Sequence, residues 1–382
     1  MGLFGSRKKK QNIVETSVKT VNSNSTPKQT NQNFVSKEFD EKNEFAQVTT
    51  RQVVSEIMDT TDNRVEETHT TNPVSQDNST YNNEENSTIQ VESQAIFQED
   101  TFVEEVSNEG AEEGLVFFKD KPPVDHIIGQ TKIFAIINQK GGVGKSTTAV
   151  NLASALGHAG KEVLLVDLDP QGNTTSGFGV NKRDLNSCVY DVLLGDEQIE
   201  NVILCGVGKR VDILPATINL AGAEVELVNE MARENRLKNA LGSLRGRYDY
   251  VLIDCPPSLG LLTINALVAS DKLLVPIQCE FYALEGVTKL LESMKRVKSM
   301  LNPSLDIVGI VLTMYDGRTN LSKQVVEEVK GFFGDTVFET IIPRTVKLSE
   351  APSYGQPINE YAPQNQGAIA YDELAKEVIA RG

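Results

Sequence analysis

The sequence has few cysteines, no long apolar run and no excess of basic residues, and each absence excludes a class of protein. The four cysteines show no paired short spacing, which argues against a disulfide-built secreted scaffold or a zinc site and favours a reducing cytoplasm. No apolar run approaches the roughly 20 residues that a membrane-spanning helix needs, and no secretory signal is visible. We therefore expect a cytoplasmic protein without a transmembrane segment.

Acidic residues are in excess, but they are unevenly distributed. The formal net charge is −16, and residues 1–130 carry 12 Lys and Arg against 23 Asp and Glu, whereas the rest carry 25 against 30. The first part is poor in large apolar residues, so it buries too little apolar surface to offset its chain entropy. We predict a disordered, low-complexity acidic tail over residues 1–125 and one folded domain over residues 131–382.

The amino-terminal residues leave two questions open. Gly2 and Ser6 match a myristoylation pattern, and the basic run Arg7 to Lys10 follows. One acyl chain with a polybasic patch would anchor a protein to a membrane, but so short a match is common by chance, and we favour no membrane contact. The pair Phe117-Phe118 either docks on a partner or is an ordinary scattered apolar pair, and we favour the second interpretation.

The central feature of the sequence is a glycine-rich loop at Lys140–Thr147. It follows the short apolar run Ile133–Ile137 and precedes a helical segment, Thr147–His158. Glycines let the N–H groups of such a loop point at one anion, and the positive end of the following helix adds to the attraction. Lys145 would reach the β- and γ-phosphates, and the Ser146 hydroxyl would bind Mg²⁺. We predict ATP and Mg²⁺ as cofactors, with the nucleotide held by Lys140, Gly141, Gly142, Val143, Gly144, Lys145, Ser146 and Thr147.

The loop departs from the standard phosphate-loop pattern at its start. Gln139 stands where the pattern has glycine, and Lys140 adds a second lysine beside it. Lys145 already balances the phosphate charge, so the added lysine makes sense if it reaches the nucleotide of an opposing subunit. We therefore hypothesise a homodimer that forms on ATP binding and that Lys140 crosses.

Two other apolar runs end in acidic residues. The run Val163–Asp167 is followed by Asp169, and alternation along a strand sends both carboxylates to the same side. One of them would interact with Mg²⁺ through a bound water, and the other would orient an attacking water. The run Tyr250–Asp254 has the form of a Walker B strand, whose terminal Asp254 would hold Mg²⁺ opposite Ser146.

Together these motifs predict phosphoryl transfer from ATP to water. Lys140 and Lys145 would stabilise charge on the transferring group, and Asp169 would align the water. The metal ligands would be Ser146, Asp169 and Asp254. No strong general base is present, so we expect slow intrinsic hydrolysis, which suits a switch.

Continuous apolar runs alternate with helical segments across the predicted domain. This pattern is typical of a doubly wound, mostly parallel α/β sheet that binds ligands beyond the carboxyl ends of its strands. The predicted strands are Ile133–Asn138, Val163–Asp167, Val211–Leu214, Tyr250–Asp254, Leu273–Ile277, Ile307–Thr313 and Val337–Ile342. Besides the one after the loop, the predicted helices are Leu220–Leu244, Leu284–Met300, Asn320–Phe333 and Ala368–Ala380.

These motifs resemble those of the ParA/MinD group of P-loop ATPases, which have a deviant Walker A loop. Thr313–Asn320 and Ile342–Gly355 look like segments of the ParA/Soj partition proteins, and the resemblance covers about Lys132 to Arg381. It implies that the loop carrying Pro343 and Thr345 packs on the adenine, and that Asp169 positions the hydrolytic water. It also implies that basic residues contact the DNA backbone from the dimer surface: Arg318, Arg344 and Lys347.

The resemblance implies a slow, partner-stimulated ATPase for chromosome or plasmid partition. Its ATP dimer would bind nonspecific DNA, placing it on the nucleoid in the cytoplasm, and a ParB-like centromere-binding protein would trigger hydrolysis and release. The alternatives are a MinD-like membrane-cycling division regulator, and a DNA-coating scaffold that uses ATP as structural glue. Tyr371–Gly382 lacks the basic amphipathic helix of MinD relatives, and no cysteine pair suits the iron–sulfur cluster of nitrogenase iron proteins.

Overall fold

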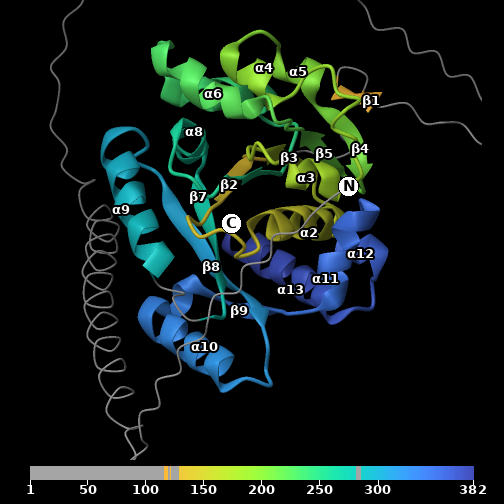
Figure 1. Cartoon of the computed structure of the whole chain (residues 1–382), viewed down its shortest axis with the longest axis vertical. Coiled ribbons are helices and arrows are strands. Elements are labelled where there is room, and N and C mark those ends of the chain that lie inside the picture. Colours follow the sequence, from red (N-terminus) through yellow and green to blue (C-terminus); the bar gives the residue numbers. More distant parts are fainter. Residues whose placement is uncertain (1–115, 119–120, 122–128, 281–284) are drawn as a thin grey trace, which may run out of the picture. The chain divides into compact units, whose positions relative to one another are not determined.

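The computed structural model describes residues 116–118, 121, 129–280 and 285–382 (Figure 1). They all fall in the second of two units of the chain, Ala46–Gly382. The predictions for residues 1–115, among them most of the tail, the myristoylation pattern and the basic run, lie outside the described residues.

The described strands form one sheet in the order β1-β4-β5-β3-β6-β2-β7-β8-β9. The pairs β1–β4 and β4–β5 are antiparallel and all other pairs are parallel, which confirms the predicted fold class. The strands are β1 (Val116–Phe117), β2 (Lys132–Ile136), β3 (Val163–Asp167), β4 (Leu204–Gly208), β5 (Val211–Leu214), β6 (Tyr250–Asp254), β7 (Lys272–Gln278), β8 (Asp306–Tyr315) and β9 (Val337–Pro343).

Helices cover both faces of this sheet. The α-helices are α2 (Lys145–His158), α3 (Asn173–Gly177), α4 (Val189–Leu194), α5 (Ile199–Val202), α6 (Leu220–Glu226), α7 (Arg236–Leu241), α8 (Leu261–Ala269), α9 (Glu285–Met300), α10 (Asn320–Phe333), α11 (Val346–Glu350), α12 (Ile358–Tyr361) and α13 (Gln366–Arg381). Single 3₁₀ turns are η2 (Leu227–Asn229), η3 (Arg233–Asn235), η4 (Gly242–Leu244), η5 (Gly334–Thr336) and η6 (Ala351–Tyr354). Within the described residues, we find no helix with the length and apolar character needed to span a bilayer.

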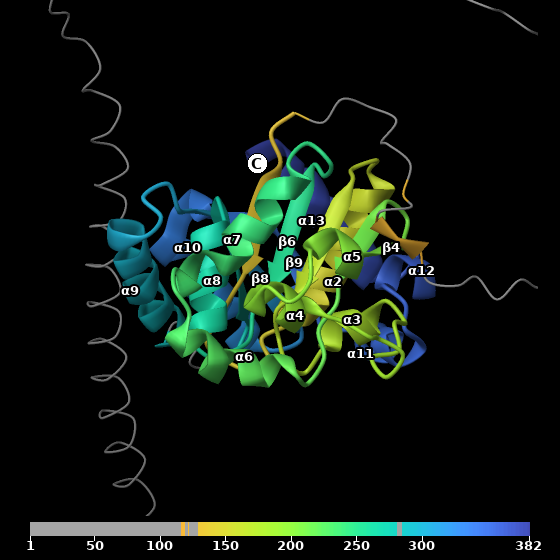
Figure 2. The same ribbon diagram turned by 90° about the horizontal axis from the view of Figure 1, so that it is seen from above.

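The core is divided by the sheet into two clusters, because successive side chains of a strand point to opposite faces. All of Val163–Asp167 is buried. Leu164 and Val166 join the cluster that α8, α9 and α10 cover, whereas Val163 and Leu165 join the cluster under α2 and α13. Figure 1 shows α2 and α13 side by side, and Figure 2 shows α7 and α8 on the other face of the sheet. A strand that is buried on both faces explains why the strand signal is a continuous apolar run.

The predicted helix Leu220–Leu244 is wrong as a single element. The chain forms α6, η2, η3, α7 and η4 there, and Ala232 before η3 has a left-handed φ of 52°. Asn265 of α8 bridges the break: its amide donates to the carbonyl of Arg233 (2.8 Å), and its oxygen accepts from the N–H of Leu237 (3.2 Å). A distant side chain thus satisfies the backbone groups that a continuous helix would have paired.

The described part begins with a strand inside the stretch that we predict as tail. Val116 pairs opposite Cys205 at the antiparallel edge of the sheet. Phe118 is buried in the core, with its ring centroid 6.1 Å from that of Tyr248. Lys121, farther along, forms ion pairs with two buried carboxylates. The structure therefore places residues of the folded domain ahead of the predicted start at residue 131, and Phe118 packs on its own chain.

Candidate functional site

The glycine-rich loop joins β2 to α2 at the carboxyl end of a central strand. Gly142 and Gly144 have φ values of 76° and 90°, which side chains disfavour. Buried Asn138 fixes the start of the loop, because its amide donates to the carbonyl of Pro276 (2.8 Å) and its oxygen accepts from the N–H of Lys140 (3.0 Å). The loop therefore curls in front of the first turn of α2, whose unpaired N–H groups suit an anion.

The two lysines of the loop lie in different environments. Lys145 is 7% exposed, and its Nζ lies 3.3 Å from the carbonyl oxygen of Lys140. Burial lowers the pKa of Lys145, against the opposite effect of Asp254 and Asp169. Lys140 is half-buried, and its ammonium has no hydrogen-bond or ion-pair partner within the described part of the chain. Lys145 therefore serves this loop, while Lys140 is available to another partner.

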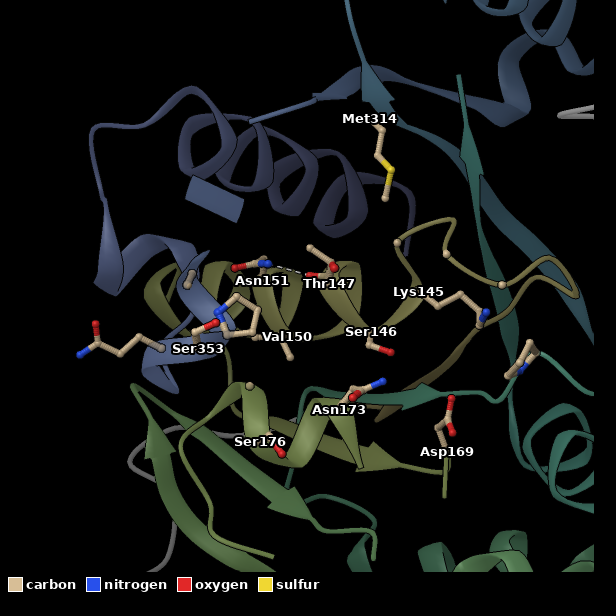
Figure 3. Close-up of a pocket in the computed structure, with 18 residues that line it drawn as sticks. Lys145, Ser146, Thr147, Val150, Asn151, Asp169, Asn173, Ser176, Met314 and Ser353 are labelled. Carbon is tan, nitrogen blue, oxygen red and sulfur yellow. Dashed lines mark hydrogen bonds between the residues drawn. The ribbon is translucent and has the colours of Figure 1, made fainter. Parts of the chain in front are cut away.

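A cavity of about 590 Å³ lies in front of the loop (Figure 3). Its size suits a small-molecule ligand. The structure brings six of the predicted loop residues into its wall: Gly141, Gly142, Gly144, Lys145, Ser146 and Thr147. Lys140 does not line the cavity, and neither does Val143, which is buried and accepts a hydrogen bond from Thr313 at its carbonyl (2.8 Å).

Asp254, at the end of β6, is fully buried beside the loop. Its Oδ2 accepts a hydrogen bond from Thr174 Oγ1 (2.6 Å), whereas its Oδ1 has no hydrogen-bond partner among the described residues. Burial and the neighbouring Asp167 raise the pKa of Asp254, and the hydroxyls of Thr174 and Ser146 oppose that rise. A buried carboxylate oxygen without a partner is costly, and a bound cation would remove that cost.

Asp167 and Asp169 take different roles although they lie two residues apart. Asp167 is buried at the end of β3, and its Oδ2 accepts hydrogen bonds from the N–H and the hydroxyl of Thr175, both at 2.7 Å. Burial raises the pKa of Asp167, and the bonds from Thr175 oppose the rise. Asp169 lines the cavity, and its Oδ1 accepts from the N–H of Gln171 (3.0 Å). Only Asp169 of this pair lines the cavity.

The oxygens beside the cavity fit the predicted magnesium ion. No cluster of three or more His, Cys, Asp or Glu in the described ranges is arranged to hold a metal by itself. Mg²⁺ takes hard oxygen ligands and keeps several waters or phosphate oxygens, so it needs few protein ligands. The hydroxyl of Ser146 and the carboxylate of Asp169 line the cavity, whereas Asp254 is fully buried and does not; all three carry oxygens of this kind. Figure 3 shows Ser146 and Asp169 near Lys145. Their roles as ligands stay predictions.

A second cavity of about 380 Å³ adjoins the first, because Gly144, Thr147, Met314 and Pro352 line both. Pro343 and Thr345, which the family resemblance assigns to the adenine, lie in its wall. Thr345 also caps α11 by accepting a hydrogen bond from the N–H of Leu348 (3.2 Å). The two cavities thus form a continuous cleft with a phosphate-loop end and a more distant end.

Sequence reasoning missed several residues of this cleft. Met314 lies where the two cavities meet and has a left-handed φ of 54°, a strained backbone of the kind that occurs at binding sites. Asn151 on α2 donates to the carbonyl of Thr147 (2.7 Å) and accepts from the N–H of Ile358 (2.6 Å). The only signal was that Met314 falls in a segment similar to the family. The first cavity is also lined by Val150, Asn173, Ser176, Gly177, Pro257, Ala351, Pro352, Ser353 and Gln356, none of which was a predicted site residue.

The predicted DNA-binding residues are exposed, but each has an acidic partner. Arg318 is 89% exposed and binds both carboxylate oxygens of Asp316, at 2.8 and 2.7 Å. This contact holds the pKa of Asp316 at about 2. Arg344 Nη1 lies 3.7 Å from Glu280, and Arg344 also lines the second cavity. Lys347 forms an ion pair of 2.9 Å with an acidic residue three positions along the chain. Of the three, only Arg344 lines the cleft, and their contact with DNA stays a prediction.

Comparisons with known proteins decide the family. A family model described as an AAA domain matches residues 131–307. The sporulation initiation inhibitor protein Soj of Bacillus subtilis is 57% identical over 251 residues, which are 66% of this chain and 99% of that protein. The chromosome-partitioning ATPase Soj of Treponema pallidum is 53% identical over 254 residues, which are 66% of this chain and 98% of that protein.

The chain belongs to the ParA/Soj family of partition ATPases. A crystal structure of cobyrinic acid a,c-diamide synthase from Mycobacterium smegmatis with bound ADP and magnesium is also similar. It is 41% identical, has a TM-score of 0.57, and the match covers 64% of this chain and 93% of that one. The predicted ParA/Soj family, the enzyme class of ATPase, and ATP with Mg²⁺ as cofactors are confirmed.

Proposed function

We propose that this ParA/Soj-family ATPase is a nucleotide-dependent switch for chromosome or plasmid partition. ATP joins two subunits face to face, and the dimer binds DNA without sequence preference on the nucleoid. A ParB-like centromere-binding protein stimulates hydrolysis, which separates the subunits and releases the DNA. The observation that carries this proposal is the contrast between the two lysines of the loop.

The environment of Lys140 supports a role between subunits. Lys145 is buried against the loop at the cavity, where one cation already faces the bound phosphates. Lys140 lies outside the lining of that cavity and has no ionic partner among the described residues. A half-buried ammonium without a counter-charge is stabilised when an anion approaches it. The triphosphate of an opposing subunit supplies such an anion.

The side chains at the cavity support slow hydrolysis. Lys145 balances charge on the transferring phosphoryl group, and Asp169, whose carboxylate is fixed by Gln171, aligns the attacking water. Ser146, Asp169 and Asp254 hold Mg²⁺, which neutralises charge on the phosphates when it is bound. No histidine lies in the wall of either cavity, so a partner that completes the site has scope to accelerate the reaction.

The MinD-like alternative is weaker because α13 is already packed. The apolar residues Tyr371, Leu374 and Val378 are buried against α2 and β9. A helix that binds a bilayer needs a free apolar face for the interface, and the buried face of α13 does not offer one. The scaffold alternative predicts bound ATP without turnover. Multiple-turnover phosphate release on adding DNA and the partner would exclude it.

Replacing Lys140 tests the dimer. We expect Lys140→Ala to bind Mg-ATP with an affinity within about threefold of wild type, because exposed or half-buried lysines outside a site contribute little, yet to stay monomeric. Sedimentation velocity of the full chain with a non-hydrolysable ATP analogue measures this. Lys209→Ala, an exposed lysine away from both cavities, is the matched control and should dimerise. Dimers of Lys140→Ala as stable as those of wild type would refute the proposal.

Charge reversal tests DNA binding. We expect Arg318→Glu with Lys347→Glu to lose ATP-dependent DNA retention by about tenfold or more at moderate salt, because phosphate contacts dominate nonspecific affinity. The matched control is Lys209→Glu with Lys376→Glu, since Lys376 forms an equivalent exposed ion pair three residues from its acid. Retention on randomised DNA is measured against salt concentration. Equal retention by the two double variants would show that Arg318 and Lys347 are not the contacts.

A further inference from the structure

In the loop after β3, backbone N–H groups point toward Asp169 and backbone carbonyls point toward Lys182. Two of its N–H groups turn toward Asp169: that of Gln171 donates to Asp169 Oδ1 (3.0 Å), and that of Gly172 donates to the Asp169 carbonyl (2.8 Å). The carbonyls of Gln171 and Gly172 turn to a cation instead, since Lys182 Nζ lies 2.7 and 3.3 Å from them. One lysine thus holds the outer side of the loop whose inner side holds Asp169.

Lys182 donates its hydrogen bonds to the backbone of this loop and not to an acidic side chain. Within the described part of the chain it forms no ion pair with a carboxylate. Its aliphatic stem packs over Gly172, where a Cβ would lie 2.6 Å from Lys182 Cδ and 2.9 Å from the carbonyl of Ala216. Gly172 has a φ of 61°, so both its conformation and the lysine above it require glycine. The position of the lysine and the shape of the loop depend on each other.

The same loop is tied to the two buried carboxylates through α3. Gly172 precedes α3, whose Thr174 donates to Asp254 (2.6 Å) and whose Thr175 donates to Asp167 (2.7 Å). The threonines anchor the far end of the loop rigidly. At the near end the N–H of Asp169 donates to Asp167 Oδ1 (3.2 Å), and the Gly172 carbonyl also accepts from the N–H and the hydroxyl of Ser176, both at 3.1 Å. Between these anchors, the carbonyl of Gln171 has Lys182 as its only donor among the described residues.

We propose that Lys182 is a positioning residue for hydrolysis, which holds the loop Asp169–Gly172 so that the second oxygen of Asp169 faces the cavity. Lys182 does not line the cavity, so it acts through the loop and does not touch the nucleotide. The inference rests on the proposed role of Asp169 in aligning water. It predicts that losing the ammonium lowers the turnover rate and leaves nucleotide binding unchanged.

The decisive variants keep the fold and change only the donor. Lys182→Met retains the stem over Gly172 but cannot donate; the Gln171 carbonyl can then turn to water, while the Gly172 carbonyl keeps its bonds from Ser176. Lys182→Arg keeps a charged donor. Lys209→Met, at an exposed lysine away from the site, is the control. Because a hydrogen bond from a charged donor typically contributes a factor of ten or more, we expect Lys182→Met to lower kcat about tenfold, with KM for ATP, thermal midpoint and dimer formation as in wild type.

A second measurement needs no nucleotide. Amide hydrogen exchange of the full chain should speed up about tenfold for residues 169–173 in Lys182→Met, because the loop opens more often, and remain slow in Lys182→Arg and Lys209→Met. If the exchange rate or kcat of Lys182→Met equalled that of a wild-type protein that hydrolyses ATP, the inference about Lys182 would be overturned and the proposed function would not be affected. If the wild-type protein formed no ATP-dependent dimers and retained no DNA, the proposed switch would be refuted. The exchange measurement would still test whether Lys182 holds the loop.

Discussion

Two pairs of buried acidic residues lie at opposite ends of the same sheet, and only one pair forms ion pairs with basic residues in the part of the chain that the structure describes. At the carboxyl ends of the strands, Asp167 and Asp254 occupy neighbouring positions on β3 and β6. At the amino ends, Glu162 precedes β3 and Asp212 lies on β5. All four acidic residues are buried, so each cluster carries a desolvation cost.

The cluster at the amino ends is fully compensated from within the chain. Asp212 accepts hydrogen bonds from Lys121 and from the Tyr248 hydroxyl, both at 2.7 Å, and Glu162 pairs with Lys121 (3.2 Å) and Arg210 (2.7 Å). Burial lowers the pKa of Lys121, but the two carboxylates outweigh it and raise that pKa. The ammonium of Lys121 is thus fixed in its charged form, and these acids have no further need of a ligand.

The cluster at the carboxyl ends is left incomplete. Its partners are neutral hydroxyls and N–H groups, one oxygen of Asp254 has no hydrogen-bond partner in the described part of the chain, and burial raises the pKa of both acids. The nearby cation, Lys145, is turned to the loop carbonyl. The comparison teaches that the acids at the amino ends are balanced by cations of the chain, whereas Asp254 is not, which supports its predicted role in holding an external cation.

Replacing Asp254 with asparagine tests the incomplete cluster directly. We expect Asp254→Asn to lower Mg-ATP hydrolysis about a thousandfold, because an amide cannot supply the charge that holds the metal at the phosphates. We also expect the nucleotide-free protein to become more stable at neutral pH. The raised pKa of Asp254 in the folded state means that ionising it destabilises the fold above the pH at which unfolded aspartate titrates.

The pH dependence separates that gain from a packing effect. The stability advantage of Asp254→Asn should be small near pH 4, should grow as the pH rises from there toward the folded-state pKa of about 7, and should level off above it. Urea unfolding at several pH values measures it. The control is Asp212→Asn at the other end of the sheet, which should lose stability and keep hydrolysis. Hydrolysis by Asp254→Asn at the wild-type rate would contradict the assignment of Asp254.

The part of this fold that was predictable is the part whose signal is local. Val163–Asp167 matches β3 end to end because every residue of that strand is buried and apolar up to its final acid. The edge strands β1 and β4 were missed, since a two-residue strand and the glycine-containing run Leu204–Gly208 have no apolar period. They exist because Phe118 and its neighbours pack on residues far along the chain.

The site shows the same division. The glycine loop was predictable because its conformation is set by its own glycines. The separate roles of Asp167 and Asp169 were not, because Thr175 captures the first and leaves the second at the cavity. Gln356 and Met314 come from distant segments and carry no spacing rule that would place them there. Resemblance supplied Pro343 and Thr345, which no local pattern indicates.

Breaking the ion pairs at the amino ends of the strands should lower stability and leave nucleotide binding unchanged. We expect Lys121→Met to lower the free energy of unfolding by about 3 kcal/mol, because removing one partner from a buried ion pair leaves a charge without compensation. The lysine side chain is 17% exposed and has two acidic partners, of which only Glu162 keeps another cation. Chemical unfolding of the full chain measures this loss, and Mg-ATP binding should be unchanged.

Lys132 supplies the matched control, because it also lies over a tyrosine but forms no ion pair with the acidic residues that the structure describes. Its Nζ is 5.6 Å from the Tyr250 ring centroid, against 5.4 Å for Lys121 over Tyr248. We expect Lys132→Met to cost about 0.5–1 kcal/mol, the size of an exposed cation–π contact. If the two variants lost equal stability, the carboxylates would not be the reason that Lys121 matters. The proposed difference between the two clusters would then be wrong for the cluster at the amino ends of the strands.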